Sequence, residues 1–234
     1  MKVSVVAPMY NEEAVAGAYL SAFDEFVCDH PDIRFELILV DDGSTDSTGS
    51  LASAFTSNYF DCQVLTHDSN LGLEKAIITG LAAAEGDLIC SMDADLQDPF
   101  FPLIQAINMF KKDPSLDIIH LERKARVGDT FFKRVTAGFV YLMISFASLG
   151  RIPNKDLANY KVLTSAARDR LLLEGTSVFR VDTWFQGFRA DFISYARTER
   201  QLGNTKFSAR KMFNFGIDTL KAVCVRVING NDQF

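Results

Sequence analysis

The sequence predicts an α/β protein with a mostly parallel central sheet flanked by helices. Through residue 121, short apolar runs alternate with segments of helical spacing, as in proteins with helices on both faces of a sheet. Three of the apolar runs end in polar or acidic side chains, at residues 8–12, at Asp41-Asp42 and at Asp93-Ala94-Asp95. Because ligands bind at the carboxyl ends of parallel strands, we expect a binding site where these three ends meet.

Five apolar or β-branched runs have the pattern of buried strands. They are residues 2–7, 35–40, 63–65, 88–92 and 116–121. The intervening segments predict helices over residues 13–28, from Ser44 or Thr45 to about 56, from 70–72 to about 85, and 99–112. Gly43 permits a tight turn, Ser44 or Thr45 can cap the second helix, and Pro99 suits the first turn of the fourth.

Charge is distributed unevenly along the chain. Of its 234 residues 48% are hydrophobic and 23% are charged, which is the composition of an ordinary globular protein. This length is sufficient for one large core, or for one core with an appendage. Residues 1–119 carry 5 Lys or Arg against 20 Asp or Glu, whereas residues 120–234 carry 19 against 10. The acidic half suits a cation, and the basic half suits a phosphate or an anionic membrane. Nucleic acid is not an expected partner, because no binding motif appears and the acidic half would repel it.

The sequence shows no sign of secretion or of a membrane span. The four cysteines are scattered without Cys-x-x-Cys spacing, as expected for reduced residues of a cytosolic protein. Pro8 and the polar residues after it interrupt the apolar N-terminal run, so it does not resemble a secretion signal. The longest uncharged stretch, Val135 to Gly150, has 16 residues. A bilayer requires roughly 20 apolar residues, and we therefore expect no transmembrane helix.

The Asp93-Ala94-Asp95 segment is a candidate cation site. Two carboxylates spaced i, i+2 at a strand end are expected to be exposed, hydrogen-bonded or bound to metal, because burying an unpaired carboxylate costs several kcal/mol. With the nearby amide oxygen of Gln97 they form the hard oxygen ligands that Mg²⁺ or Mn²⁺ prefers. The alternative is an acidic turn that caps the following helix.

Four motifs of the first half resemble those of family 2 glycosyltransferases with the GT-A fold. They are Pro8-Met9-Tyr10-Asn11-Glu12-Glu13, Val40-Asp41-Asp42-Gly43-Ser44-Thr45-Asp46, Asn70-x-Gly72 and Met92-Asp93-Ala94-Asp95-Leu96-Gln97-Asp98-Pro99. The last resembles the polyprenyl-phosphate branch, which contains dolichyl-phosphate mannose synthase and bacterial undecaprenyl-phosphate glucosyltransferases. Three motifs of the second half resemble the bacterial members: Arg123-x-x-Arg126, Phe132-Lys133-Arg134 and Tyr195-x-Arg197-x-Glu199-Arg200-x-x-Gly203-x-Thr205-Lys206. The resemblance therefore covers nearly the whole chain.

The resemblance implies roles for individual residues. The nucleotide would be bound by Pro8, Tyr10, Glu12, Val40, Asp42, Asp93 and Ala94. The cation, Mg²⁺ or Mn²⁺, would be bound by Asp93, Asp95 and Gln97. Catalytic roles would fall to Asp93, Asp95, Arg123 and Arg200, and the acceptor phosphate would be bound by Arg126, Lys133, Arg134, Arg197 and Lys206. No role is implied for His67 or His120.

The resemblance also implies a domain organisation. Residues 1–205 would form a GT-A catalytic domain, with a nucleotide-sugar and metal half at 1–121 and an acceptor half at 122–205. Residues 206–234 would form an amphipathic helix that contacts the membrane or a second subunit, with a homo-oligomer as one option. Many bacterial members continue into two membrane-spanning helices. The sequence is therefore either a piece of a longer protein or a form that contacts the membrane only peripherally.

The activity that the resemblance implies is an inverting, metal-dependent transfer of a sugar from a nucleotide-diphosphate sugar to a polyprenyl phosphate. It would serve cell-envelope glycan synthesis at the cytoplasmic face of the inner membrane, with the protein peripheral there. UDP is favoured over GDP, because the second half resembles the bacterial members. Two alternatives are a family 2 enzyme with a soluble saccharide or protein acceptor, and a catalytically inactive nucleotide-sugar-binding protein.

One departure from the family bears on the acceptor. Members often have Asp-Phe-Arg-Leu-Met where this chain has Asn159-Tyr160-Lys161-Val162-Leu163. An amide thus replaces a carboxylate proposed to act near the acceptor. A phosphate acceptor is largely dianionic at neutral pH, so it needs positioning more than a general base. A sugar hydroxyl would need the missing base, and Asn159 therefore favours a phosphate acceptor.

Overall fold

The computed structural model describes residues 1–123, 142–152, 158–197 and 209–230. In this part of the chain seven strands form one sheet in the order β3-β2-β1-β4-β6-β5-β7. The strands are β1 (Lys2–Met9), β2 (Arg34–Asp41), β3 (Asp61–Thr66), β4 (Leu88–Ser91), β5 (Ile118–Arg123), β6 (Lys161–Thr164) and β7 (Ala190–Tyr195). All neighbours pair in parallel except β6, which is antiparallel to both β4 and β5. The predicted mostly parallel sheet is confirmed.

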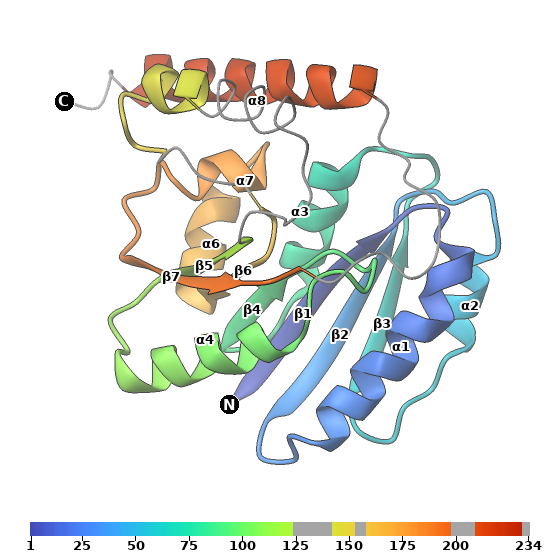
Figure 1. The fold of residues 1–234 in the computed structure, drawn as a ribbon. Helices are drawn as coiled ribbons and strands as arrows, with labels where there is room; N and C mark the ends of the chain where they lie inside the picture. The colour runs from blue at the N-terminus through green and yellow to red at the C-terminus, as the bar shows by residue number, and fades with distance from the viewer. Residues whose placement is uncertain (124–141, 153–157, 198–208, 231–234) are drawn as a thin grey trace.

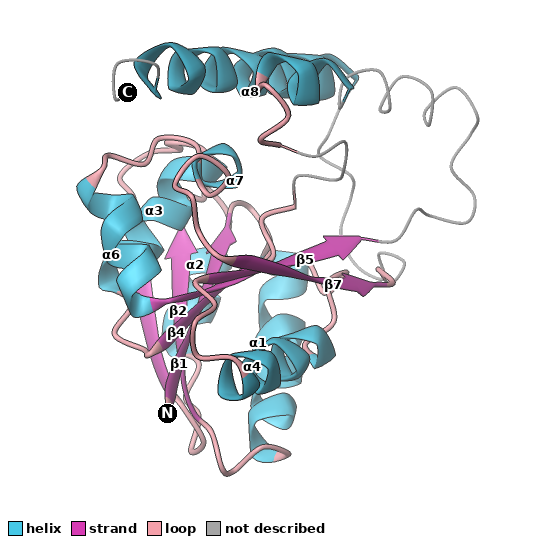
Figure 2. Ribbon diagram, turned by 90° about the vertical axis from the view of Figure 1, so that its left-hand side faces the viewer, coloured by secondary structure: helices cyan, strands magenta, loops and turns pink. Residues whose placement is uncertain are grey.

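Helices cover both faces of this sheet (Figures 1 and 2). They are α1 (Glu13–Cys28), α2 (Thr48–Ala54), α3 (Leu73–Ala83), α4 (Phe101–Lys112), α6 (Ser165–Leu173), α7 (Phe179–Asp182) and α8 (Ala209–Gly230). Residues 142–147 are also helical. One core cluster joins the sheet to α1 and α4, with Phe23 at its centre, and a second joins it to α3 and α6 around Ile77. All four cysteines are free.

Two predicted helix starts are wrong. The second helix begins at Thr48 rather than after Ser44 or Thr45, because the Asp46 carboxylate accepts the N–H of Thr48 at 3.0 Å. The Ser44 hydroxyl instead accepts the N–H of Asn11 at 2.9 Å, which ties two loops together.

The fourth helix begins at Phe101 rather than Pro99. Pro102 occupies its first turn, where a missing N–H leaves no helical hydrogen bond unmade. Pro99 lies before the helix, and its carbonyl oxygen accepts the hydroxyl of Tyr160 at 2.9 Å. This contact joins the end of the Asp93–Pro99 segment to β6.

The predicted meeting of strand ends is confirmed by the register of the sheet. Met9 of β1 pairs with Asp41 of β2, and Val6 of β1 pairs with Ser91 of β4. The segments that follow these three strands therefore leave the sheet at one edge, which we call the carboxyl edge.

Helix α8 lies beside α7 at the top of Figure 1 and contacts it through polar side chains. Arg226 donates to the Asp182 carboxylate at 2.6 Å, and the Thr219 hydroxyl accepts from Arg180 at 3.2 Å. Arg180 also pairs with Glu74 of α3. These contacts connect α8 to α3 through α7. None of the helices in the described part of the chain has the length and apolar composition needed to cross a bilayer.

We predict that Asp182→Ala destabilises the protein by about 3 kcal/mol. The Asp182 carboxylate is 1% exposed and accepts the N–H groups of Ser177 and Val178 as well as Arg226. Its removal would leave two amides and a guanidinium without their partner. Urea denaturation measures the change. The matched control is Asp218→Ala on α8, whose exposed ion pair with Lys221 should contribute less than about 1 kcal/mol. Equal effects of the two substitutions would contradict the prediction.

Candidate functional site

The carboxylates of Asp93 and Asp95 converge beyond the end of β4. One guanidinium nitrogen of Arg197 lies 3.4 Å from Asp93 and 3.0 Å from Asp95. Leu96 turns the chain with φ of 58°, and the N–H of Gln97 donates to Asp95 at 3.0 Å. This local turn holds the two carboxylates around a common point. The sequence prediction that they act together is therefore consistent with their geometry.

Asp98 is a buried carboxylate that pairs with the basic side chains of this site. Its side chain has no exposed surface, and it accepts the hydroxyl of Tyr195 at 2.6 Å. It forms ion pairs with Arg197 at 2.9 Å and with Arg123 at 3.3 Å. Arg123 also donates to Asp93 at 3.1 Å. Arg123 and Tyr195 are paired residues at the ends of the parallel strands β5 and β7, and this pairing positions both at the carboxyl edge.

Burial and neighbouring charge shift the pKa of two groups at this site, Asp93 and Tyr195. Removal from water in this half-buried setting, followed by the neighbouring charge of Asp98, raises the pKa of Asp93 to about 6 against the opposing effect of Arg123. Burial and then the Asp98 charge raise the pKa of Tyr195 well above its usual value of 10.0, so Tyr195 remains a hydrogen-bond donor. The excess of negative charge at this point favours a bound cation.

The residues present fit a hard divalent cation. Two carboxylates face one point at which a positively charged nitrogen already lies, and their oxygens are the ligands that Mg²⁺ and Mn²⁺ prefer. In the described ranges no group of three or more His, Cys, Asp or Glu side chains is arranged to hold a metal. A site of two carboxylates completed by substrate phosphates is the usual arrangement for Mg²⁺. Gln97 is buried, and its role as a third ligand stays a prediction.

The residues predicted to bind the nucleotide lie on the same edge. Pro8 and Val40 are paired in adjacent strands, and Tyr10 is exposed just beyond β1. The N–H of Glu12 donates to the Thr48 hydroxyl at 2.7 Å, which fixes the loop that carries Glu12. Ala94 is buried between the two site carboxylates in the sequence. Their contacts with a nucleotide stay predictions.

Asp42 has a structural task that the sequence did not reveal. Its buried carboxylate accepts the N–H groups of Leu71 and Gly72 at 2.9 and 2.8 Å. His67, to which we assigned no role, contacts the same carboxylate at 2.8 Å and the Thr79 hydroxyl at 3.0 Å. Asp42 thus holds the loop of residues 67–72 against the carboxyl edge. The position of His67 near the end of the predicted strand 63–65 was the available signal.

Several predicted residues lie outside the described ranges. These are Arg126, Lys133, Arg134, Arg200 and Lys206. Asn159 is described and lies directly before Tyr160, which is buried and whose hydroxyl donates to the Pro99 carbonyl oxygen. Asn159 is 7% exposed, and its side-chain oxygen has no hydrogen-bond partner among the described residues. A buried polar oxygen of this kind is satisfied when a water, an ion or a ligand supplies the missing partner.

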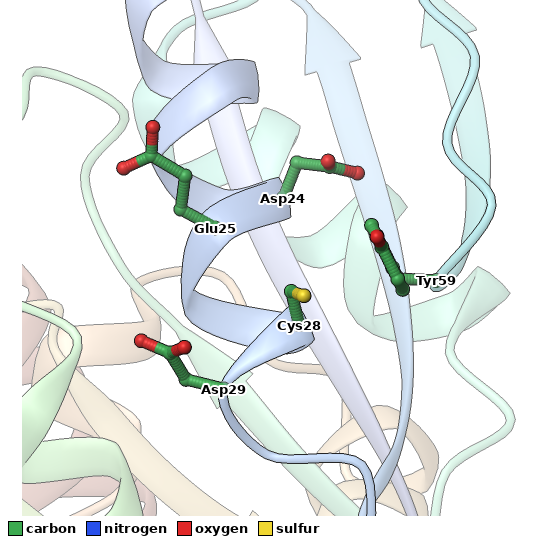
Figure 3. A pocket seen from close by; sticks show the side chains of 5 residues that line it. All are labelled: Asp24, Glu25, Cys28, Asp29 and Tyr59. Carbon is green, nitrogen blue, oxygen red and sulfur yellow. The ribbon is translucent and has the colours of Figure 1, made fainter.

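A separate cavity of about 430 Å³ lies at the C-terminal end of α1 (Figure 3). It is lined by Asp24, Glu25, Cys28, Asp29 and Tyr59. Because α1 runs back from the carboxyl edge, its C-terminus lies at the opposite edge of the sheet. None of the residues that we predicted for the site lines this cavity.

Comparison with known proteins identifies similar sequences. The family model described as "Glycosyl transferase family 2" matches residues 4–174. The uncharacterized glycosyltransferase YkcC of Bacillus subtilis is 30% identical over 220 residues, which span 93% of this chain and 67% of YkcC. The prophage bactoprenol glucosyl transferase homolog of Escherichia coli is 28% identical over 221 residues, 93% of this chain and 71% of that protein. The chain thus spans about two thirds of the length of these relatives.

Solved structures share the fold. Glucosyl-3-phosphoglycerate synthase from Mycobacterium tuberculosis, in complex with Mn²⁺, UDP and phosphoglyceric acid, matches with a TM-score of 0.68 and 20% identity, covering 95% of this chain and 78% of its own. TarS residues 1–349 from S. aureus, in complex with UDP-GlcNAc, matches with a TM-score of 0.66 and 20% identity, covering 98% of this chain and 67% of its own. The predicted GT-A fold is confirmed.

We predict that Gly43→Ala destabilises the protein by about 2 kcal/mol or more. Gly43 has φ of +69°, and an added Cβ would lie 2.4 Å from the backbone carbon of Ser69 in the loop that Asp42 holds. Gly17→Ala in α1 is the control, because a Cβ there meets nothing within 4 Å. The control should be neutral or stabilising by about 0.5–1 kcal/mol. Chemical denaturation of both variants checks the difference in sign.

Proposed function

Because the chain belongs to glycosyl transferase family 2, we propose that it transfers a sugar from a nucleotide-diphosphate sugar to a polyprenyl phosphate, with inversion at the anomeric carbon. The observation that carries the proposal is the convergence of Asp93 and Asp95 at the carboxyl edge, beside Arg123 and Arg197. Carboxylates that suit a cation therefore lie next to guanidinium groups that suit phosphate. The cation and phosphate chemistry of the transfer would meet at this point.

The donor would be a UDP-sugar bound with Mg²⁺ or Mn²⁺ on Asp93 and Asp95. The bound ion would neutralise charge on the departing diphosphate. Support comes from the shared fold of enzymes whose solved complexes contain UDP and Mn²⁺. Pro8, Tyr10, Glu12, Val40 and Asp42 would position the nucleoside, with Asp42 acting through the loop of residues 67–72.

The acceptor would be a lipid phosphate. Similar relatives are named as bactoprenol glucosyl transferases or homologs of them, and this name supports a polyprenol-based acceptor. Asn159 replaces a carboxylate that family members often have and that is proposed to act near the acceptor, and a largely dianionic phosphate acceptor would not need that base. Arg123 and Arg197 would orient this phosphate together with the basic residues of 124–141 and 198–208.

Contact with the cytoplasmic face of a membrane would be made by residues 142–149 and α8. Four large apolar side chains of the first segment are exposed: Leu142, Met143, Phe146 and Leu149. Ile144 of the same segment packs with Val223 of α8 in one buried cluster, so the two segments are neighbours. Ile217, Val225 and Ile228 of α8 are exposed as well. A group of apolar side chains of this size is typical of a surface that contacts lipid or another protein.

We predict that Asp95→Ala lowers sugar transfer by about 100-fold or more, because one carboxylate holding the ion is lost. A radiolabelled UDP-sugar, Mn²⁺ and undecaprenyl phosphate are supplied, and label extracted into organic solvent is counted. Mn²⁺-dependent thermal stabilisation by the UDP-sugar should disappear in the same variant. The control is Asp113→Ala, since Asp113 forms an exposed ion pair with Arg189. Label that enters only a soluble saccharide fraction, or unchanged transfer by Asp95→Ala, would overturn the proposal.

We predict that Phe146→Asp together with Leu149→Asp weakens binding to vesicles about tenfold or more, because each buried apolar side chain contributes about 1.5–3 kcal/mol. Co-sedimentation with vesicles that contain phosphatidylglycerol measures the loss. Tyr59→Asp is the control, since Tyr59 is 54% exposed but lies beside the cavity at the opposite edge of the sheet. Equal binding by both variants would exclude this segment as the contact.

A further inference from the structure

Asp98 differs from the two carboxylates beside it. The side chains of Asp93 and Asp95 are 27% and 18% exposed, whereas that of Asp98 is 0% exposed. Both Asp98 oxygens are occupied, one by Tyr195 and Arg197 and the other by Arg123. Asp98 is therefore enclosed by protein groups, and it is not placed to contact substrate.

The two arginines each span from Asp98 to the exposed carboxylates. The Arg197 Nε lies 2.9 Å from an Asp98 oxygen, an ion-pair contact without hydrogen-bond geometry, and its Nη2 donates to Asp93 and Asp95. The Nη2 of Arg123 contacts both Asp98 and Asp93, and its Nε lies 3.4 Å from the Tyr195 hydroxyl. A guanidinium has five donors in a rigid planar fork, so it can keep one partner while it exchanges another.

The charge of this cluster explains why such an exchange is needed. Three carboxylates and two guanidinium groups leave one negative charge in a half-buried site. A divalent cation between Asp93 and Asp95 would compete with the Arg197 nitrogen for the same oxygens. Without a second anchor, arginines displaced from those carboxylates would lose their ion pairs. Asp98 supplies that anchor, because a fully buried carboxylate is strongly destabilising unless it stays paired.

We propose that Asp98 is a positioning residue that holds Arg123 and Arg197 at the site, whether their outer nitrogens face Asp93 and Asp95 or phosphate oxygens. The inference deepens the proposed function and rests on it. Arg197 thereby lies in the cation's place before the substrate binds and beside the diphosphate or acceptor phosphate afterwards. Tyr195 completes the anchor by donating to Asp98.

A double-mutant cycle with Asp98→Asn and Arg197→Gln tests this proposal through Mn²⁺ binding, followed by electron paramagnetic resonance of the free ion without nucleotide. Arg197→Gln should tighten Mn²⁺ binding several-fold, because the competing nitrogen is gone. Asp98→Asn should weaken it about tenfold when Arg197 is present, since the arginine then depends on Asp93 and Asp95. In the Arg197→Gln background, Asp98→Asn should weaken Mn²⁺ binding by about threefold or less.

The outcomes separate positioning from folding and from the proposed function. If Asp98→Asn weakens Mn²⁺ binding equally in both backgrounds, Asp98 acts on the cation only through its charge, and the inference is overturned. If Asp98→Asn does not fold, the Arg197→Gln variant decides by itself. The inference is supported if this variant binds Mn²⁺ more tightly without nucleotide but binds UDP more weakly in the presence of Mn²⁺. It is overturned if both affinities fall. Asp113→Asn, at an exposed pair with Arg189, should change neither. If the four proteins give the expected cycle of Mn²⁺ affinities but the wild-type protein transfers no sugar to undecaprenyl phosphate, only the proposed function is overturned.

Discussion

The ion-pair cluster of Asp93, Asp95 and Asp98 with Arg123 and Arg197 is the interaction on which the site depends. It joins the strongly acidic first half of the chain to the basic second half. Because β7 pairs in parallel with β5, the residues after both strands reach the same edge as the residues after β4. The uneven charge distribution in the sequence thus has a structural counterpart, since the basic half offsets all but one of the negative charges of this cluster.

The regular part of the fold could be predicted because it depends on local periodicity. Strands and helices through β5 follow from alternating apolar runs, and the meeting of strand ends follows from parallel pairing alone. Helix starts were less predictable, because several side chains near Asp46 can act as caps. Ser44 does not cap α2, since its hydroxyl already accepts the N–H of Asn11 in another loop, and the Asp46 carboxylate accepts the N–H of Thr48 at the start of the helix. Local sequence cannot reveal that competition.

The tasks of Asp98, Tyr195 and His67 could not be predicted because their partners are distant in sequence. Tyr195 and Asp98 lie 97 positions apart, and His67 and Asp42 lie 25 apart. The second half also buries polar groups against expectation. Lys161 is 1% exposed, contacts the His120 ring nitrogen at 2.9 Å and lies 5.5 Å from the centre of the Trp184 ring. Such strands lack the apolar pattern that predicts burial.

The orientation of α8 bears on the membrane proposal. Over residues 217–228, the side chains that face the body include Thr219 and Arg226, which bind buried charged groups, with Val223 between them. Leu220, Ala222 and Val227 also pack inward, and the exposed side includes Val225 and Ile228 together with the charged side chains of Asp218 and Lys221. A surface helix in water usually turns its apolar stripe inward and its polar groups outward. The outer side of α8 departs from that rule through Val225 and Ile228, and these exposed apolar side chains are the ones that the proposed membrane contact would use.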